Sequence, residues 1–130
     1  MRKCNKDFSK EFKQRIYNFI LELLKFSENY DWKDVVCQVI KKQFIRSGTS
    51  IGANYIEAIA GGSDRDFANY LRHCLKSANE TQFWLVLLRD MNKGDQQKLK
   101  ALLCEVIEIS RLLGASVKTL QKKNQKKKGI

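Results

Sequence analysis

The chain has 130 residues, enough for one domain around one hydrophobic core, and 43% of them are hydrophobic. It carries 25 basic and 14 acidic side chains, a formal net charge of +11, and no proline. Its longest apolar run, Phe83 to Leu88, is far shorter than the roughly 20 residues of a membrane span, which excludes a membrane class. The segment from Met1 to Asp7 is polar, which predicts a cytoplasmic protein without a signal peptide.

The first predicted element is a helix from about Ser9 to Ser27. Because proline breaks helices and marks loops, its absence already favours long helices with short connections. A seam of apolar residues at spacings of 4, 3, 4 and 3 is typical of a helix in a bundle. The seam comprises Phe12, Ile16, Phe19, Leu23 and Phe26. A turn is predicted at Asn29 to Asp31.

The second predicted helix begins near Asp31 and runs to about Ala60. Asp31 and Asp34 suit the positive end of a helix dipole. The segment from Arg46 to Ala53 reads RSGTSIGA, with two glycines four residues apart, and each glycine costs a helix about 1 kcal/mol relative to alanine. Two interpretations fit: a kink, or close packing against a neighbouring backbone. Since the apolar spacing resumes in phase, a continuous or mildly kinked helix is expected.

The third predicted helix runs from Asp64 to about Met91. Gly61 and Gly62 end the preceding helix, and Ser63 followed by Asp66 resembles a capping box. The apolar seam again has nearly heptad spacing, and a turn is predicted at residues 92–94.

The fourth predicted helix is capped by Asp95 and runs to about Leu120. Its seam has spacings of 4, 3, 4, 3, 4 and 3, and comprises Leu99, Leu103, Val106, Ser110, Leu113, Val117 and Leu120. Residues 121–130 are polar and basic, which predicts a disordered tail after a bundle domain spanning residues 1–120.

Four amphipathic helices with short connections predict an all-α, antiparallel, up-down-up-down four-helix bundle. The predicted core residues are Ile16, Phe19, Leu23, Ile40, Leu71, Leu85, Leu103 and Val106. Further apolar residues widen the last two helices: Phe83, Trp84, Leu87, Leu102, Ile109 and Leu112. They either thicken the core or form a subunit interface, and the second interpretation predicts a cyclic homo-oligomer.

No motif indicates catalysis, a cofactor or a metal. The cysteines at positions 4, 37, 74 and 104 are scattered, and His73 is the single histidine. Zinc sites need clustered ligands, and the glycines form no phosphate-binding loop. The chain is therefore predicted to be no enzyme and to hold no cofactor or metal, with Cys37, Cys74 and Cys104 as small core residues.

Polar residues three apart on two helices predict a partly buried network. Asn54 and Glu57 share one face, as do Ser77 and Glu80, and Arg46 lies two turns before Asn54. A buried carboxylate needs a partner, and Arg46 suits that role. The alternative is that these groups simply face water.

The basic residues predict a nucleic-acid surface. Six of the 25 lie in the last 13 residues, and the other 117 residues carry 19 basic and 14 acidic side chains. The six are Lys118, Lys122, Lys123, Lys126, Lys127 and Lys128. Arg65, Arg72 and Lys76 follow one face of the third helix, and Lys41 and Lys42 lie on the second. The alternative is a charge that serves solubility alone.

The segment from Arg46 to Ala58 resembles the signature of the 23S ribosomal RNA intervening-sequence protein family. The matching positions are Arg46, Ser50, Ile51, Asn54 and Glu57. A second part of the family pattern, an aromatic residue, a leucine and Ser-x-x-Glu, matches Phe67, Leu71, Ser77 and Glu80. Arg111 to Gly114 also suits the family's last helix, so the resemblance spans roughly residues 9 to 120. Gly52 and Ala58 depart from the proline and glycine that are usual there.

The resemblance implies the same bundle and, through the related accessory variability proteins of diversity-generating retroelements, a basic ring, with a pentamer preferred. It also implies contact with RNA or DNA and, in a retroelement context, with a reverse transcriptase. It supplies no reaction. The leading hypothesis is therefore a non-enzymatic oligomer that binds RNA or a ribonucleoprotein partner. The rival hypothesis is a purely structural assembly module.

Overall fold

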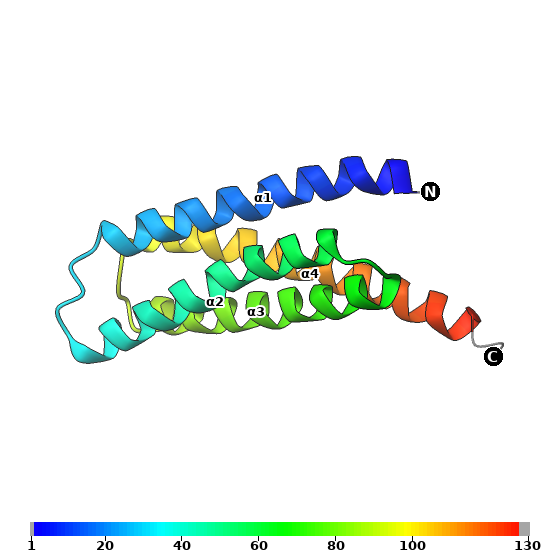
Figure 1. Ribbon diagram of the computed structural model, residues 1–130. Helices are drawn as coiled ribbons and strands as arrows, with labels where there is room; N and C mark the ends of the chain where they lie inside the picture. The colour runs from blue at the N-terminus through cyan, green and yellow to red at the C-terminus, as the bar shows by residue number, and fades with distance from the viewer. Residues whose placement is uncertain (1, 128–130) are drawn as a thin grey trace.

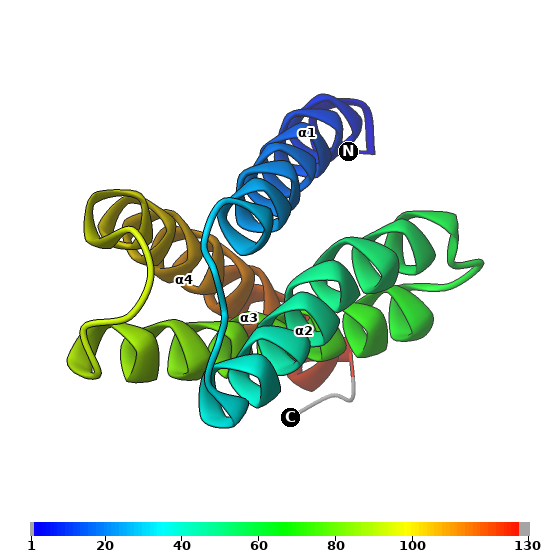
Figure 2. The ribbon, with the colours of Figure 1, turned by 90° about the vertical axis from the view of Figure 1, so that its left-hand side faces the viewer.

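The four predicted helices form an antiparallel bundle in the computed structural model, which describes the backbone of residues 2–127 and the side chains of residues 9–126. They are α1 (Arg2–Glu28), α2 (Val35–Ala60), α3 (Asp64–Asp90) and α4 (Gln96–Lys127). The chain runs up and down through them, so the start of α1, the start of α3 and the end of α4 lie at the same end of the bundle (Figure 1). Viewed end-on, α1 lies between α2 and α4, and α3 lies opposite it (Figure 2). The up-down-up-down prediction is confirmed.

The start of α2 differs from the prediction, because the helix begins at Val35 rather than near Asp31. Asp34 is the N-cap: its carboxylate accepts the backbone N–H of Cys37 at 2.7 Å, which lowers the Asp34 pKa. The connection before it is held by Trp32, whose buried indole N–H donates to the Ser27 carbonyl at 2.6 Å. The connection from α1 is therefore an anchored loop that extends past Asp31.

The other two connections follow the predicted capping chemistry. Ser63 Oγ accepts the backbone N–H of Asp66 at 3.1 Å, and Asp95 Oδ1 accepts from the N–H groups of Gln97 and Lys98. Between α3 and α4 the backbone takes positive φ values at Asn92 (57°) and Gly94 (84°), a region that glycine and asparagine tolerate. These turns place α3 beside both α2 and α4.

Both outer ends of the bundle extend beyond the predicted limits. Helix α1 begins at Arg2 rather than Ser9, and α4 continues to Lys127 rather than ending at Leu120. Residues 121–126 are helical and exposed, because lysine and glutamine are good helix formers even without packing partners. The predicted tail is therefore helical to Lys127, and Lys128 lies outside the described residues.

All eight predicted core residues are buried, so the predicted core is confirmed. The additional apolar residues of α3 and α4 were predicted either to thicken the core or to form a subunit interface, and they differ in burial. Leu102 and Ile109 are buried and thicken the core, whereas Phe83 is 54% exposed. Leu112, Trp84 and Leu87 pack partly buried against the core. None of the helices, as far as the structure describes them, is long and apolar enough to cross a membrane.

Helix α2 is continuous, and its glycines serve close packing against α1. Gly48 is buried, and a Cβ atom placed there would overlap the Leu23 Cδ2 methyl. A Cβ at Gly52 would lie 2.7 Å from Ile20 Cδ1. The close-packing interpretation of the two glycines therefore holds, and α2 continues through them without a break.

We expect Gly48→Ala to destabilise the fold by about 1–3 kcal/mol, because the added methyl must displace the fully buried Leu23. This loss outweighs the gain of about 1 kcal/mol in helix propensity. The matched control is Gly114→Ala on α4, where a Cβ meets nothing within 4 Å and should stabilise by about 0.5–1 kcal/mol. Urea unfolding of the two variants checks the pair, and equal stabilisation by both would show that Gly48 is not a packing site.

Candidate functional site

A seam of small hydroxyl residues joins α2 to α3. Thr81 Oγ1 lies 2.8 Å from Ser47 Oγ, inside the core, and 2.8 Å from its own helix's Ser77 carbonyl. One turn further on, Ser77 Oγ lies 3.2 Å from Ser50 Oγ. Small side chains let the two helices approach closely, and the hydroxyls satisfy one another's hydrogen bonds.

The outer edge of this seam carries an ion pair. The Arg46 guanidinium pairs with the Glu80 carboxylate and also donates to Gln43 Oε1. Glu80 Oε2 further accepts the indole N–H of Trp84 at 2.9 Å. The side chains of Arg46 and Glu80 are 59% and 36% exposed, so water screens their attraction and it contributes little to stability.

The structure brings four of the five predicted network residues to the seam. Asn54 Nδ2 donates to the Ser50 carbonyl at 2.9 Å and to Ser50 Oγ at 3.0 Å, and Ser50 in turn contacts Ser77. The Glu57 side chain is exposed, and no ion pair or hydrogen bond joins it to any residue whose side chain is described. Ser50 and Trp84 were missed, although each lies four residues from a predicted member on its own helix.

Two rows of basic side chains run from the middle of α3 and of α4 toward the end of the bundle where α3 begins and α4 ends, which is called the basic end below. On α3 the row is Arg65, Arg72 and Lys76. On α4 the row is Arg111, Lys118 and Lys122, with the same spacing of 7 and 4 residues. Arg111 was not among the predicted nucleic-acid-binding residues. Because α3 and α4 are antiparallel neighbours, these six residues lie in the same half of the α3–α4 pair, from the middle of both helices to the end where α3 begins.

The other predicted basic residues do not join these rows. Lys41 and Lys42 lie in the first third of α2, at the opposite end of the bundle from the start of α3 (Figure 1). Lys123 and Lys126 are exposed on the part of α4 that extends beyond the core. Lys127 ends α4 but its side chain is outside the described set, as is the whole of Lys128.

The residues with catalytic chemistry are dispersed. His73 is exposed beside the Tyr70 ring, with 6.1 Å between ring centroids. Cys74 is buried, which raises the pKa of its thiol to about 12, and its Sγ lies 3.5 Å from the Ile51 carbonyl. Cys104 is exposed, so its predicted core position was wrong. Within residues 9–126 no group of three side chains is placed to hold a metal ion.

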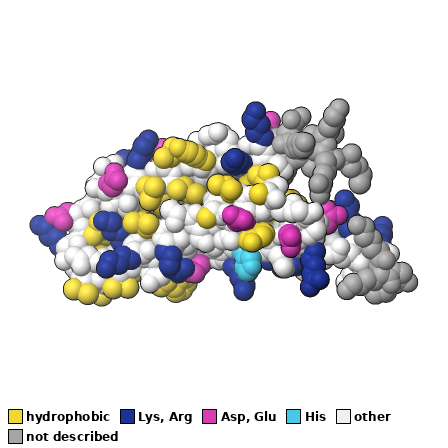
Figure 3. Space-filling view, in the orientation of Figure 1, with side chains coloured by type: hydrophobic (Ala, Val, Ile, Leu, Met, Phe, Trp, Pro, Cys, Tyr) yellow, Lys and Arg dark blue, Asp and Glu magenta, His cyan; other side chains and the backbone are white. Residues whose placement is uncertain are grey.

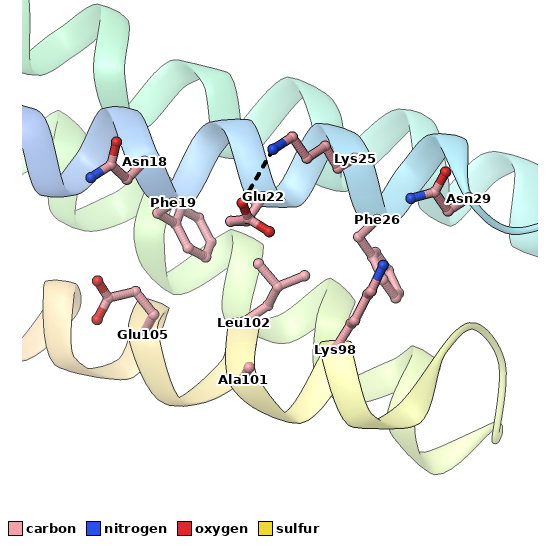
Figure 4. Close-up of a pocket in the computed structure, with 10 residues that line it drawn as sticks. All are labelled: Asn18, Phe19, Glu22, Lys25, Phe26, Asn29, Lys98, Ala101, Leu102 and Glu105. Carbon is pink, nitrogen blue, oxygen red and sulfur yellow. Dashed lines mark ion pairs between the residues drawn. The ribbon is translucent and has the colours of Figure 1, made fainter.

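A groove of about 250 Å³ lies between α1 and α4 (Figure 4). Phe19, Phe26 and Leu102 form its apolar floor, with charged and amide side chains at its rim. Next to it, Arg15 makes a two-pronged ion pair with Glu105 at 2.7 and 2.9 Å, which raises the Arg15 pKa. The lining contains no histidine, serine or cysteine, and the floor of the groove is apolar.

Large apolar side chains remain exposed on two different faces. On α1 and α2 they are Tyr17, Leu21, Ile56 and Ile59; on α2 and α3 they are Val35, Val36, Val39, Phe83 and Met91; Ile107 is a further exposed residue, on α4. Figure 3 shows hydrophobic side chains gathered along the line between α1 and α2 and near the start of α2. Contiguous exposed apolar surface is typical of protein contact sites.

The comparisons with known proteins agree with this architecture. The model of the family described as 23S rRNA-intervening sequence protein matches residues 7–115. A solved structure, a protein of unknown function from the S23 ribosomal protein family of Bacteroides thetaiotaomicron, is 32% identical with a TM-score of 0.73. That match covers 85% of this chain and 97% of the other. A comparison with curated proteins finds no match.

We expect Glu80→Ala to lower the free energy of unfolding by up to about 1 kcal/mol, because it removes the partner of both Arg46 and Trp84. Glu57→Ala should change it by less than about 0.5 kcal/mol, as exposed substitutions usually do. A double-mutant cycle with Arg46→Ala, followed by urea unfolding, isolates the pair. A larger loss from Glu57→Ala than from Glu80→Ala would contradict this geometry.

Proposed function

The chain belongs to the family of 23S rRNA-intervening sequence proteins, and from this premise we propose that it is a non-enzymatic homo-oligomer that binds RNA through basic surfaces. The observation that carries the proposal is that six basic side chains from α3 and α4 lie in the same half of this helix pair. Lysine and arginine bind phosphate backbones by neutralising charge and releasing counterions, which requires no cleft.

Self-association is supported by the two exposed apolar faces. The faces differ in position and composition, so a contact of one with the other joins unlike surfaces. Such head-to-tail contacts close into rings when the rotation between subunits allows it. The resemblance to the retroelement accessory proteins favours five subunits and extends the proposal to DNA and a reverse transcriptase as further partners.

A ring would raise the affinity of a weak phosphate-binding surface. Each subunit repeats the basic end, so contacts that are weak individually act together on one RNA molecule. Binding through phosphates carries little sequence information. The proposed activity is therefore sequence-tolerant and strongly dependent on salt.

A structural assembly module is the second candidate function. It is favoured by the exposed apolar faces, which by themselves require a partner protein and no nucleic acid. In that case the charge of +11 keeps the assembly soluble.

We expect the intact protein to form a cyclic oligomer, with a pentamer preferred, at micromolar concentration in light scattering. Replacing Val36 and Val39 by aspartate on one face, or Ile56 and Ile59 on the other, should each produce smaller species, since both faces enter every contact of a ring. Gln97→Asp, an exposed change outside both faces, is the control. A monomeric wild type rules out the assembly.

We expect RNA binding that weakens steeply with salt, because each phosphate contact contributes close to one unit to the slope of log affinity against log salt. Truncation after Leu120 and the triple change of Arg65, Arg72 and Lys76 to glutamine should each reduce affinity. Fluorescence anisotropy at several salt concentrations measures both effects. If the intact protein shows no affinity at physiological salt, the structural-module function replaces this one.

A further inference from the structure

We propose that the RNA bound at the basic end is double-stranded, with one phosphate backbone contacted from α3 and the other from α4. The inference rests on the proposed RNA-binding function and specifies its substrate class. The α3 row is Arg65, Arg72 and Lys76; the α4 row is Arg111, Lys118 and Lys122.

The α3 row faces away from α2. The side chains that α3 directs at α2 include Ser77, Glu80 and Thr81, which bond to Ser50, Arg46 and Ser47. At 3.6 residues per turn, the row lies roughly a third of a turn around the axis from them. It is also turned away from the buried seam of α3, so it occupies the solvent flank on the side of α4.

The α4 row faces away from α1. Glu105 and Leu102 mark the side of α4 that meets α1, through the Arg15 ion pair and the shared groove. The row lies more than about a third of a turn from that side, on the solvent flank next to α3. Both rows therefore border the same outer face of the α3–α4 pair.

The spacing of the rows suits two strands. Packed helices lie about 8–10 Å apart, so each of the two lines of charge can face one of the two phosphate backbones that border the wide, shallow minor groove of an A-form RNA duplex. Within a row, steps of 7 and 4 residues correspond to about 10 and 6 Å along the helix. A single strand would meet one row at a time, whereas a duplex presents two backbones to both.

The charge of the rows is largely uncompensated. Arg72 Nη1 donates to the amide oxygen of Asn69 at 3.3 Å, a neutral partner. Glu108 lies 3.5 Å from Arg111 Nη1, in a pair whose arginine is 73% exposed. The arginine therefore keeps solvent-facing N–H groups for a phosphate oxygen.

The α4 row lacks the feature that single-strand binding proteins use. Those proteins stack bases on aromatic side chains, and residues 96–127 contain no aromatic residue. On α3 the exposed aromatic residue beyond the row is Phe83, seven residues after Lys76, and its ring packs edge-on against Trp84 at 5.0 Å between centroids. Phe83 lies in line with the row, about two turns beyond Lys76 and toward the opposite end of α3 from Arg65.

The test compares a 20-base-pair RNA duplex with one of its own strands, by fluorescence anisotropy of the full chain over a series of salt concentrations. Two variants change each row to glutamine: Arg65, Arg72 and Lys76, or Arg111, Lys118 and Lys122. The control changes three exposed lysines of α1, Lys10, Lys13 and Lys25, and removes the same charge. Circular dichroism melting verifies that each variant is folded.

We expect the duplex to bind more tightly than the strand, and each row variant to weaken duplex binding about tenfold or more and lower the salt slope by about three. The control should retain most of the affinity. Equal or tighter binding of the strand, an effect of only one row, or an equal effect of the control overturns the duplex assignment and leaves RNA binding intact. Absence of binding to either RNA overturns the proposed function as well.

Discussion

The close approach of α2 to both of its neighbours is the constraint on which the bundle depends. On the side of α1, Gly48 and Gly52 leave room for the branched ends of Leu23 and Ile20. On the side of α3, Ser47 and Ser50 meet Thr81 and Ser77 through hydroxyl groups. Larger residues at these positions would push the helices apart and open voids in a core whose members are almost completely buried.

This constraint gives the family signature a physical meaning in the monomer. Arg46, Ser50 and Asn54 lie along the α2–α3 seam, where they bond to Glu80, to Ser77 and to the α2 backbone. In this chain these three signature residues therefore join two packed helices. Glu57 is the exception, because it is exposed and the packing of the monomer assigns it no role.

The exposed apolar side chains and the exposed basic rows lie on different parts of the bundle surface. Most exposed large apolar side chains lie on α1, α2 and the second half of α3, with Ile107 on α4, whereas the two basic rows lie on the first half of α3 and the second half of α4. Subunit contacts through α1, α2 and the second half of α3 would leave the basic rows in solvent. The assembly and the phosphate binding that we propose would therefore use different residues.

The sequence alone determined the number, order and approximate limits of the helices and the composition of the core, because apolar spacing and capping residues act over a few residues along the chain. It also predicted which basic residues share a helix face. It did not show that Arg111 belongs to a basic row of α4 on the outer face of the α3–α4 pair, or that Cys104 faces solvent. Those facts depend on how each helix is rotated against its neighbours. The rotation is decided by tertiary packing, here by the small residues of α2, which local patterns do not encode.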